Sequence, residues 1–293
     1  MTGGGRAPRA FQPMNYRHIY HVGNFADVLK HTALVWVLLH LRKKDKPFAM
    51  IDTHAGRGIY DIGGAEAQKT GEASEGILRL LALSSVPGML SRFLDIVRSF
   101  GQGLYPGSPL VAAQMLRPND RLIAIECQTA EYDELAKQLT PFANARAIHG
   151  DGYRELPRLL PLHERRGVIL IDPPYEDEDE FSRAAETLVS AHHRFATAIY
   201  MLWYPAKEQP KVSATAGELL NAGIESLVRI ELDVGAKPER QGGRGPPMSA
   251  TGLLIVNPPF GFTSEMQTVL PFLAETLAQG PGATSRVEIL AER

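Results

Sequence analysis

The chain has 293 residues, of which 44% are hydrophobic and 22% charged, so it is long enough to bury a sizeable core and is ordinary for a globular protein. Its apolar runs are shorter than the roughly 20 residues of a membrane span, and the single cysteine, Cys127, excludes a disulfide framework. The net charge of −2 excludes a general affinity for polyanions, so a nucleic acid would have to be bound by local basic clusters, such as those at 42–46, 165–166 and 237–244. Since its first residues lack the apolar core of a signal peptide, the chain is expected to be cytoplasmic. It is also expected to be a monomer that needs no membrane and no metal.

The first residues and the first helix differ sharply in composition. Residues 1–13 are rich in Gly, Pro and Arg and are expected to be a disordered extension, whereas 14–293 are assigned to one domain. A long helix is predicted from Asn24, which suits the N-cap position, to the region of Pro47. A strand at 48–52 follows, and the glycine-bearing turn THAGRG after it is typical of the start of a nucleotide-binding βα unit.

Six further apolar segments are predicted as strands, at 121–126, 145–151, 167–175, 197–205, 226–234 and 252–260. Helical patterns separate the first five strands, which favours crossovers and a parallel sheet. A Gly/Pro-rich loop joins the last two, which favours an antiparallel hairpin. This is the layout of an α/β class I S-adenosylmethionine-dependent methyltransferase, with a Rossmann-like seven-stranded sheet whose last strand is antiparallel.

The spacing after the first strand indicates an insertion. An acidic residue that holds a ribose usually lies about 20 residues beyond the glycine-rich turn, but the next predicted strand that ends in an acid stops at Glu126. The stretches EASEGILRLLAL and GMLSRFLDIVRSF in between are helical in pattern. We therefore expect a small inserted helical subdomain at about 61–107.

Polar residues close the first three predicted strands. Asp52 ends the first strand ahead of the glycines at 56–58, which let the backbone approach a ligand closely. Glu126 ends the second strand, where its carboxylate can accept from two ribose hydroxyls. Asp151 and Gly152 end the third, where the carboxylate can hold an adenine amine. The Gly-x-Gly turn alone also fits an ordinary tight turn, and only the three strand ends together favour a nucleoside site.

The motif DPPY, from Asp172 to Tyr175, directly follows the apolar run VILI. Methylating an exocyclic amine is hard because the nitrogen lone pair is delocalised into the ring, so an enzyme must place acceptors on the amine hydrogens. Asp172 supplies a carboxylate, and Pro173 and Pro174 fix where the neighbouring carbonyls point. The Tyr175 ring can stack on an unpaired base. The motif also fits a strand-ending Pro-Pro turn in which the aspartate is only a cap.

A similar motif, NPPF, runs from Asn257 to Phe260 after the apolar run GLLIV. The strand before it is predicted to be antiparallel to its neighbours, so its end should emerge at the sheet edge opposite the ligand crevice. We therefore assign this motif to structure.

The segments YRHIYHVGNFADVLKH, DTHAGRGIYD, YPGSPL, DGY, VILIDPPYE and IYMLWYP resemble the RlmJ family of 23S ribosomal RNA adenine N-methyltransferases, over nearly the whole chain from Tyr16 to about Phe260. The resemblance implies S-adenosylmethionine as cofactor, 23S ribosomal RNA as partner and Asp172 as the catalytic acceptor. It implies cofactor contacts at His31, His54, Ser108, Glu126, Asp151, Gly152 and Asp172. It implies substrate contacts at Tyr16, His18, Lys30, Pro173, Pro174 and Tyr175. From the residues alone, His31 also fits a core or surface histidine, and His54 also fits a helix cap.

The sequence thus predicts methylation of the exocyclic 6-amino group of an adenine in 23S ribosomal RNA, with protein-free RNA as substrate. The DPPY motif also suits a cytosine or guanine amine. A catalytically idle RNA-binding protein on the same fold is a further alternative, which the intact Asp172 disfavours. The loop from Lys237 to Gly252 and the first 13 residues depart from the family pattern, which concerns RNA docking rather than the chemistry.

Overall fold

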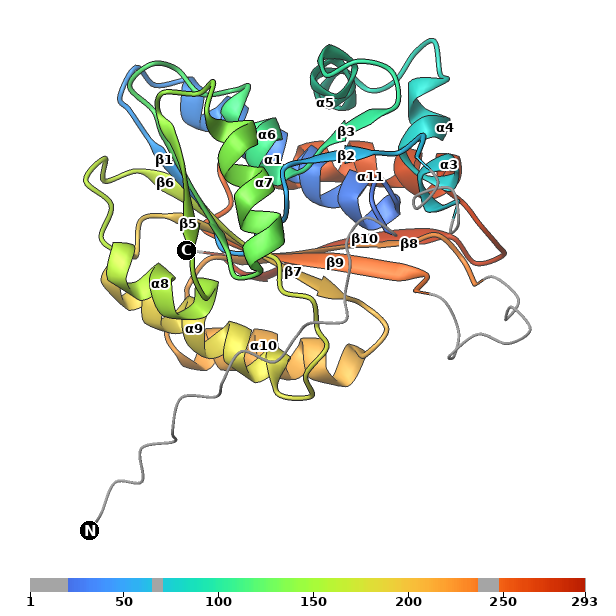
Figure 1. Ribbon diagram of the computed structural model, residues 1–293. Helices are drawn as coiled ribbons and strands as arrows, with labels where there is room; N and C mark the ends of the chain where they lie inside the picture. Colours follow the sequence, from blue (N-terminus) through green and yellow to red (C-terminus); the bar gives the residue numbers. More distant parts are fainter. Residues whose placement is uncertain (1–20, 65–70, 237–247, 293) are drawn as a thin grey trace.

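An eight-stranded mixed sheet lies between two layers of helices in the computed structural model of the protein, which describes residues 21–64, 71–236 and 248–292 (Figure 1). The strand order is β10-β8-β9-β7-β6-β1-β4-β5. The strands of this sheet are β1 (Ala49–Asp52), β4 (Arg121–Glu126), β5 (Ala145–His149), β6 (Gly167–Ile171), β7 (Ile199–Pro205), β8 (Leu227–Asp233), β9 (Ala250–Val256) and β10 (Thr284–Ala291).

The direction of the strands follows the predicted pattern. Strands β5, β4, β1, β6 and β7 are parallel neighbours, and β9 runs antiparallel to both β7 and β8. The seven predicted strands are therefore confirmed, with the long hairpin at the end. Strand β10, which pairs antiparallel with β8, is an eighth strand that the sequence pattern did not predict.

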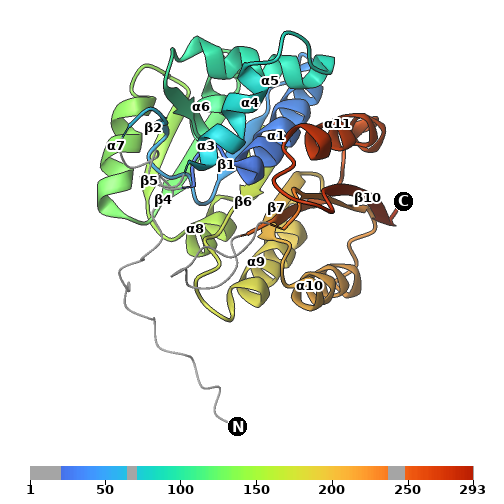
Figure 2. The same ribbon diagram turned by 90° about the vertical axis from the view of Figure 1, so that its right-hand side faces the viewer.

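Each face of the sheet carries its own hydrophobic core, because successive side chains of a strand point to opposite faces. In β1, Met50 belongs to the core under the first helix layer, whereas Ala49 and Ile51 belong to the other. In Figure 2, α1 and α11 lie above the sheet and α9 and α10 below it. One layer consists of α1 (Phe25–Arg42), α6 (Ser108–Ala113), α7 (Thr129–Leu139) and α11 (Phe262–Thr276), and the other of α8 (Gly152–Leu159), α9 (Glu180–Arg194) and α10 (Gln209–Asn221).

Helix α1 begins where the sequence predicts. The side chain of Asn24 accepts hydrogen bonds from the backbone N–H groups of Ala26 and Asp27, at 2.9 and 3.1 Å, as an N-cap residue does. The helix is buried along most of its length and holds Lys30 and His31 in the interior. None of the helices in the described part of the chain is long and apolar enough to cross a membrane.

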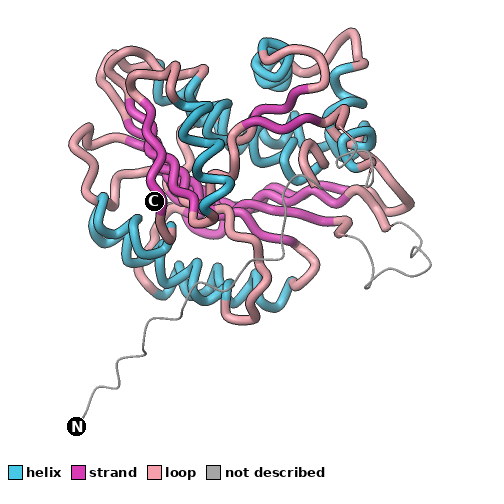
Figure 3. The backbone as a smooth tube through the Cα atoms, viewed as in Figure 1, coloured by secondary structure: helices cyan, strands magenta, loops and turns pink. Residues whose placement is uncertain are grey.

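Between β1 and β4 the chain leaves the sheet. A small two-stranded sheet, β2 (Ile59–Asp61) and β3 (Leu104–Pro106), stands apart from the main one in Figure 3. The helices α3 (Glu72–Glu75), α4 (Ile77–Leu81) and α5 (Gly88–Ser99) lie between these strands. Two hydrogen bonds join α4 to the rest of the protein. Ile77 N–H donates to the Gly23 carbonyl at 2.8 Å, just before α1, and Arg79 donates to the Ala278 carbonyl at 2.7 Å, just after α11.

The two Pro-Pro motifs lie at opposite edges of the sheet. Asp172 follows the carboxyl end of β6, whereas the Asn257 amide donates to the carbonyls of Ala196 and Ala198, at 2.8 and 2.7 Å, just before β7 begins. Because β9 is antiparallel to β7, its end emerges beside the start of β7, as expected for a structural motif.

Candidate active site

Three acidic side chains gather at the carboxyl ends of neighbouring strands. Asp52 ends β1, Glu126 ends β4 and Asp172 directly follows β6, and β1 is paired with both of the other strands. The carboxyl ends of parallel strands are where open α/β sheets bind their ligands. This edge is therefore the candidate active site.

Asp172 is held by a lysine from another part of the chain. The Lys30 ammonium donates to Asp172 Oδ2 at 2.6 Å and lies 2.9 Å from Asp27 Oδ1. Burial opposes the charge of Lys30, but the two carboxylates outweigh it and raise the pKa of the lysine above its usual value. The lysine therefore stays charged, occupies one oxygen of Asp172 and leaves Oδ1 to accept from another donor.

Two aromatic side chains flank this ion pair. The Tyr175 hydroxyl donates to the Trp203 carbonyl at 2.7 Å, and its ring packs 4.4 Å from that of Phe181. Trp203 is half-buried, its indole N–H donates to the Thr251 hydroxyl at 2.8 Å, and the Lys30 ammonium lies 5.9 Å from its ring centroid. Both rings are thus fixed in place beside Asp172.

Asp27 and Trp203 are absent from the residues predicted from the sequence. The position of Trp203 near the end of the strand after the DPPY motif was the available signal, since that strand ends at the same edge of the sheet. For Asp27, the i,i+3 spacing to Lys30 is that of an ordinary ion pair on a helix surface, so it carries no signal of a site.

The turn after β1 is tied to the end of β4. Glu126 accepts hydrogen bonds from the N–H groups of Gly56 and Gln128, at 2.9 and 2.7 Å, while burial raises its pKa. Gly56 has φ +63°, and a Cβ atom there would overlap the Tyr60 hydroxyl, so glycine is required. Glu126 thereby lies against the glycine-rich turn, with lone pairs left for further donors.

Asp151 caps the helix that follows β5. Its Oδ1 accepts from Tyr153 N–H at 3.0 Å, and its Oδ2 accepts from Arg183 at 2.9 Å. Gly152 lies so close to the turn after β1 that a Cβ atom would overlap the Thr53 carbonyl oxygen. The structure therefore uses both residues for packing and capping, and a cofactor contact of either one stays a prediction.

Asp52 is fully buried, and its Oδ2 has no hydrogen-bond partner among the described residues. Its Oδ1 accepts from His54 N–H at 3.3 Å. Burial raises the pKa of Asp52 to about 7, against the lowering effect of the Ser108 hydroxyl, and the nearby Asp172 raises it further. A buried carboxylate oxygen without a donor is a place for a ligand donor.

The remaining predicted residues are distributed around this edge. The His54 ring lies against Tyr153, centroids 4.9 Å apart, and burial lowers its pKa to about 3, so the ring is neutral. His31 Nδ1 is 2.8 Å from the Tyr105 hydroxyl, which joins α1 to β3. Ser108 begins α6. Tyr16 and His18 lie outside the described residues.

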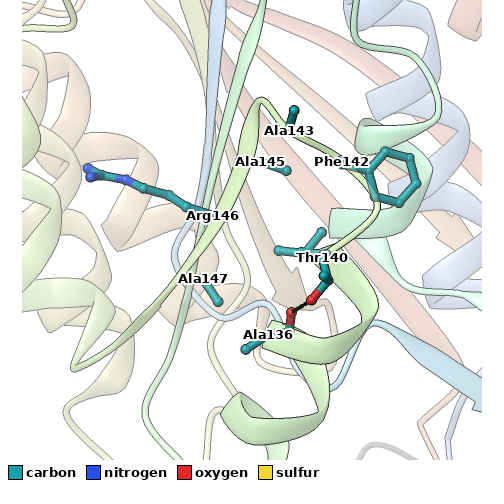
Figure 4. Close-up of a pocket in the computed structure, with 8 residues that line it drawn as sticks. Ala136, Thr140, Phe142, Ala143, Ala145, Arg146 and Ala147 are labelled. Atoms are coloured by element: carbon teal, nitrogen blue, oxygen red, sulfur yellow. Dashed lines mark hydrogen bonds between the residues drawn. The ribbon is translucent and has the colours of Figure 1, made fainter.

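A shallow surface pocket of about 300 Å³ lies elsewhere, between the end of α7 and β5 (Figure 4). It is lined mainly by alanines, with Phe142 and Arg146, and contains none of the predicted site residues. No group of three potential metal ligands occurs within residues 21–64, 71–236 and 248–292.

The strand order, with five parallel strands closed by an antiparallel hairpin, and the acids at the carboxyl ends of β1, β4 and β6 define a class I methyltransferase fold. The family model of the ribosomal RNA large subunit methyltransferase RlmJ matches residues 45–290. The chain belongs to this family and is a methyltransferase.

Two curated relatives carry the name ribosomal RNA large subunit methyltransferase J. The protein of Escherichia coli strain K12 is 37% identical over 94% of this chain and 98% of its own length, and that of Haemophilus influenzae is 35% identical over 92% and 96%. The crystal structure of a Legionella pneumophila protein, 34% identical, superimposes with a TM-score of 0.82 over 92% of this chain and 98% of that one.

Proposed function

We propose that the protein transfers a methyl group from S-adenosylmethionine to the exocyclic 6-amino group of an adenine in 23S ribosomal RNA, with protein-free RNA as its substrate. The observation that carries the proposal is the Asp172 carboxylate, fixed by Lys30 at the carboxyl end of β6 with one oxygen left to accept. The names of the two curated relatives support a large-subunit ribosomal RNA as substrate.

The residues at the strand ends fit S-adenosylmethionine. The cofactor carries an ammonium group, and the buried Asp52 Oδ2 is an acceptor that lacks a donor. Its ribose carries two hydroxyls, and Glu126 at the next strand end retains lone pairs for them. When bound, the cofactor supplies an electrophilic methyl group.

Asp172 acts on the nitrogen that is methylated. As the amine nitrogen attacks the methyl group in line, positive charge develops on it, and a carboxylate within hydrogen-bond distance stabilises that charge and accepts a proton as it leaves. Lys30 fixes the direction of the carboxylate and keeps it from rotating away. Tyr175 and Trp203 offer ring faces beside it, on which an unpaired base can be held.

Methyl transfer to RNA from a strain lacking the gene tests the proposal. Deproteinised 23S ribosomal RNA and labelled S-adenosylmethionine should yield labelled N6-methyladenosine after digestion to nucleosides. Replacing Asp172 by Ala should lower turnover by about 10²–10⁴-fold, because the carboxylate acts in the transition state, while cofactor affinity changes little.

The matched control is Asn257→Ala in the other Pro-Pro motif, which should retain the wild-type rate at saturating RNA in a folded protein, because its amide lies at the opposite edge of the sheet. Near wild-type turnover by Asp172→Ala, with loss of turnover in Asn257→Ala, would show that the wrong motif was chosen. Label found in methylcytidine or in a methylguanosine would show that the methylated base is a cytosine or a guanine and not an adenine.

A further inference from the structure

Two basic segments that are far apart in the sequence meet at the sheet edge opposite the active site. Arg166, just before β6, donates to the carbonyls of Lys46 and Leu41, at 2.6 and 2.9 Å. Arg117, shortly before β4, donates to the Lys44 carbonyl at 2.9 Å. The loop between α1 and β1 is thus clamped by two arginines, and its lysines are brought beside Arg165 and Arg166.

Most of the positive charge at this edge is uncompensated. Lys43, Lys44, Lys46 and Arg165 are exposed, and no carboxylate of the described residues forms an ion pair with them. Of the nearby acids, Asp120 and Glu164 are already paired with Arg117 and Arg121, and the exposed Asp45 offsets only one of the positive charges. The concentration of cations is notable in a chain whose net charge is −2.

The pKa of a histidine at this edge, His40, is affected by the same charges. His40 has a buried Nδ1 atom without a hydrogen-bond partner among the described residues. Burial, followed by the charges of Lys43, Lys44 and Arg166, lowers the pKa of its ring. The local potential is therefore positive even below the surface.

An exposed aromatic side chain adjoins these cations. Phe260, the last residue of the NPPF motif, is 95% exposed. The next residue, Gly261, lies against the Trp36 ring, and the Lys43 ammonium is 6.0 Å from the centroid of that ring. The two hydrogen bonds of the Asn257 amide fix the loop that presents Phe260. A rigid, exposed ring beside unpaired cations is how proteins hold an unstacked base next to its phosphates.

We propose that this surface is a second contact for the RNA substrate, separate from the active site. We call it the basic edge: Lys43, Lys44, Lys46, Arg165, Arg166 and Phe260. The cations bind phosphates, and an unpaired base stacks on Phe260. This inference rests on the proposed function, since it concerns the same RNA.

The position of the basic edge determines which RNA can reach it. It faces away from Asp172, across the four residues of β1, each of which rises about 3.3 Å. We expect a short stem-loop in the active site to leave the basic edge uncovered, because the two surfaces lie at opposite ends of the parallel strands. A neighbouring helix of a large folded RNA can, so the basic edge should select long substrates.

Binding of two RNAs tests the proposal: full-length deproteinised 23S ribosomal RNA, and a short stem-loop that carries the target adenine in its unmethylated form. The double variant Lys43→Glu, Lys44→Glu should bind the long RNA at least about tenfold more weakly and with a shallower salt dependence. Phe260→Ala should weaken binding of the long RNA about fivefold or more, because one stacked base is lost. Both variants should bind and methylate the stem-loop like the wild type, which also shows that they are folded.

The matched control is Arg92→Glu, Arg98→Glu, which makes the same change in net charge on exposed residues of α5. It should not produce the selective loss of long-RNA binding. If the variants of the basic edge bind both RNAs like the wild type, the proposal is overturned and Phe260 becomes a candidate protein contact. If the wild type binds the RNAs without methylating them, the proposed function fails. Weaker binding of the long RNA alone by the Lys43/Lys44 and Phe260 variants would still support the basic edge.

Discussion

At the scale of single residues, the arrangement that matters most is the ion pair between Lys30 and Asp172. The Lys30 ammonium lies between two carboxylates, 2.6 Å from Asp172 Oδ2 and 2.9 Å from Asp27 Oδ1. A carboxylate that accepts a proton during catalysis must point at the amine. In the proposed function the buried lysine fixes that direction, so we propose it as a positioning residue as well as a substrate contact.

Replacing Lys30 by Met should lower the single-turnover rate by about 10²-fold or more, within the range expected for general acid–base catalysis. Lys30→Arg, which keeps the positive charge, should retain more of the rate than Lys30→Met. Single-turnover rates at saturating RNA and cofactor measure both variants, and an equal loss in the two would contradict the assignment of Lys30 to holding Asp172.

Because Asp52 is buried, we expect the free energy of unfolding to depend on pH. In the folded protein its pKa is raised to about 7, mainly by burial, whereas in the unfolded chain it lies near 4. Protonated Asp52 therefore stabilises the folded protein relative to the ionised form. This contribution is fully present below about pH 4, and it is lost as the pH rises through about 7. Without cofactor, the free energy of unfolding should therefore fall by about 1 kcal/mol per pH unit over this window, relative to Asp52→Asn. Urea unfolding of both proteins at pH 5, 6 and 7 measures the difference, and a constant difference would contradict the prediction.

The acids at the strand ends could be predicted from the sequence because each one closes an apolar run. The partners of Asp172 could not be predicted in the same way. Lys30 lies 142 positions away, and only the packing of α1 on the sheet brings it to the carboxylate. Trp203 likewise depends on β7 lying beside β6.

At the scale of elements, the start of α1 links the inserted segment to the active site. Asn24 caps the helix that carries Lys30, and its amide also donates to Glu72 of α3 at 2.9 Å. Asn24→Ala should lower the free energy of unfolding by about 0.5–2 kcal/mol, because two N–H groups at the helix start lose their acceptor. Denaturant unfolding tests this, with Asn24→Ser as a control that keeps a capping acceptor and adds no charge beside Glu72. Equal stability of the alanine variant and the wild type would refute it.

The elements that the sequence did not predict are those with weak patterns. Strand β10 is a half-exposed edge strand with charged residues at Arg286 and Glu288, so its apolar alternation is incomplete. Two ion pairs, between Glu288 and Arg229 and between Arg286 and Glu231, help to hold β10 against β8. Strands β2 and β3 have three residues each, and only their pairing with each other defines them. Long-range pairing of this kind leaves little trace in local periodicity.

At the scale of the whole molecule, charge and shape limit which form of the RNA can be used. The net charge is −2, so cations without an acidic partner can act only locally, as Lys43, Lys44, Lys46 and Arg165 do at one edge of the sheet. A target base must leave its stack to reach Asp172 at the strand ends, where Tyr175 and Trp203 offer rings. An RNA that is locally unpaired and free of other proteins meets this requirement most easily.

Deproteinised 23S ribosomal RNA should therefore be methylated faster than assembled large subunits, when both come from a strain lacking the gene. In an assembled subunit, unstacking the base also breaks contacts with neighbouring RNA and proteins, which adds to the cost of a few kcal/mol for extruding it. Initial rates at equal RNA concentration and equal salt measure the preference, since binding to phosphates depends steeply on salt. The Asp172→Ala protein, assayed on both substrates, gives the background. Faster methylation of the assembled subunits would mean that the enzyme recognises a finished ribosomal surface, and the basic edge would then have to bind RNA that remains exposed on that surface.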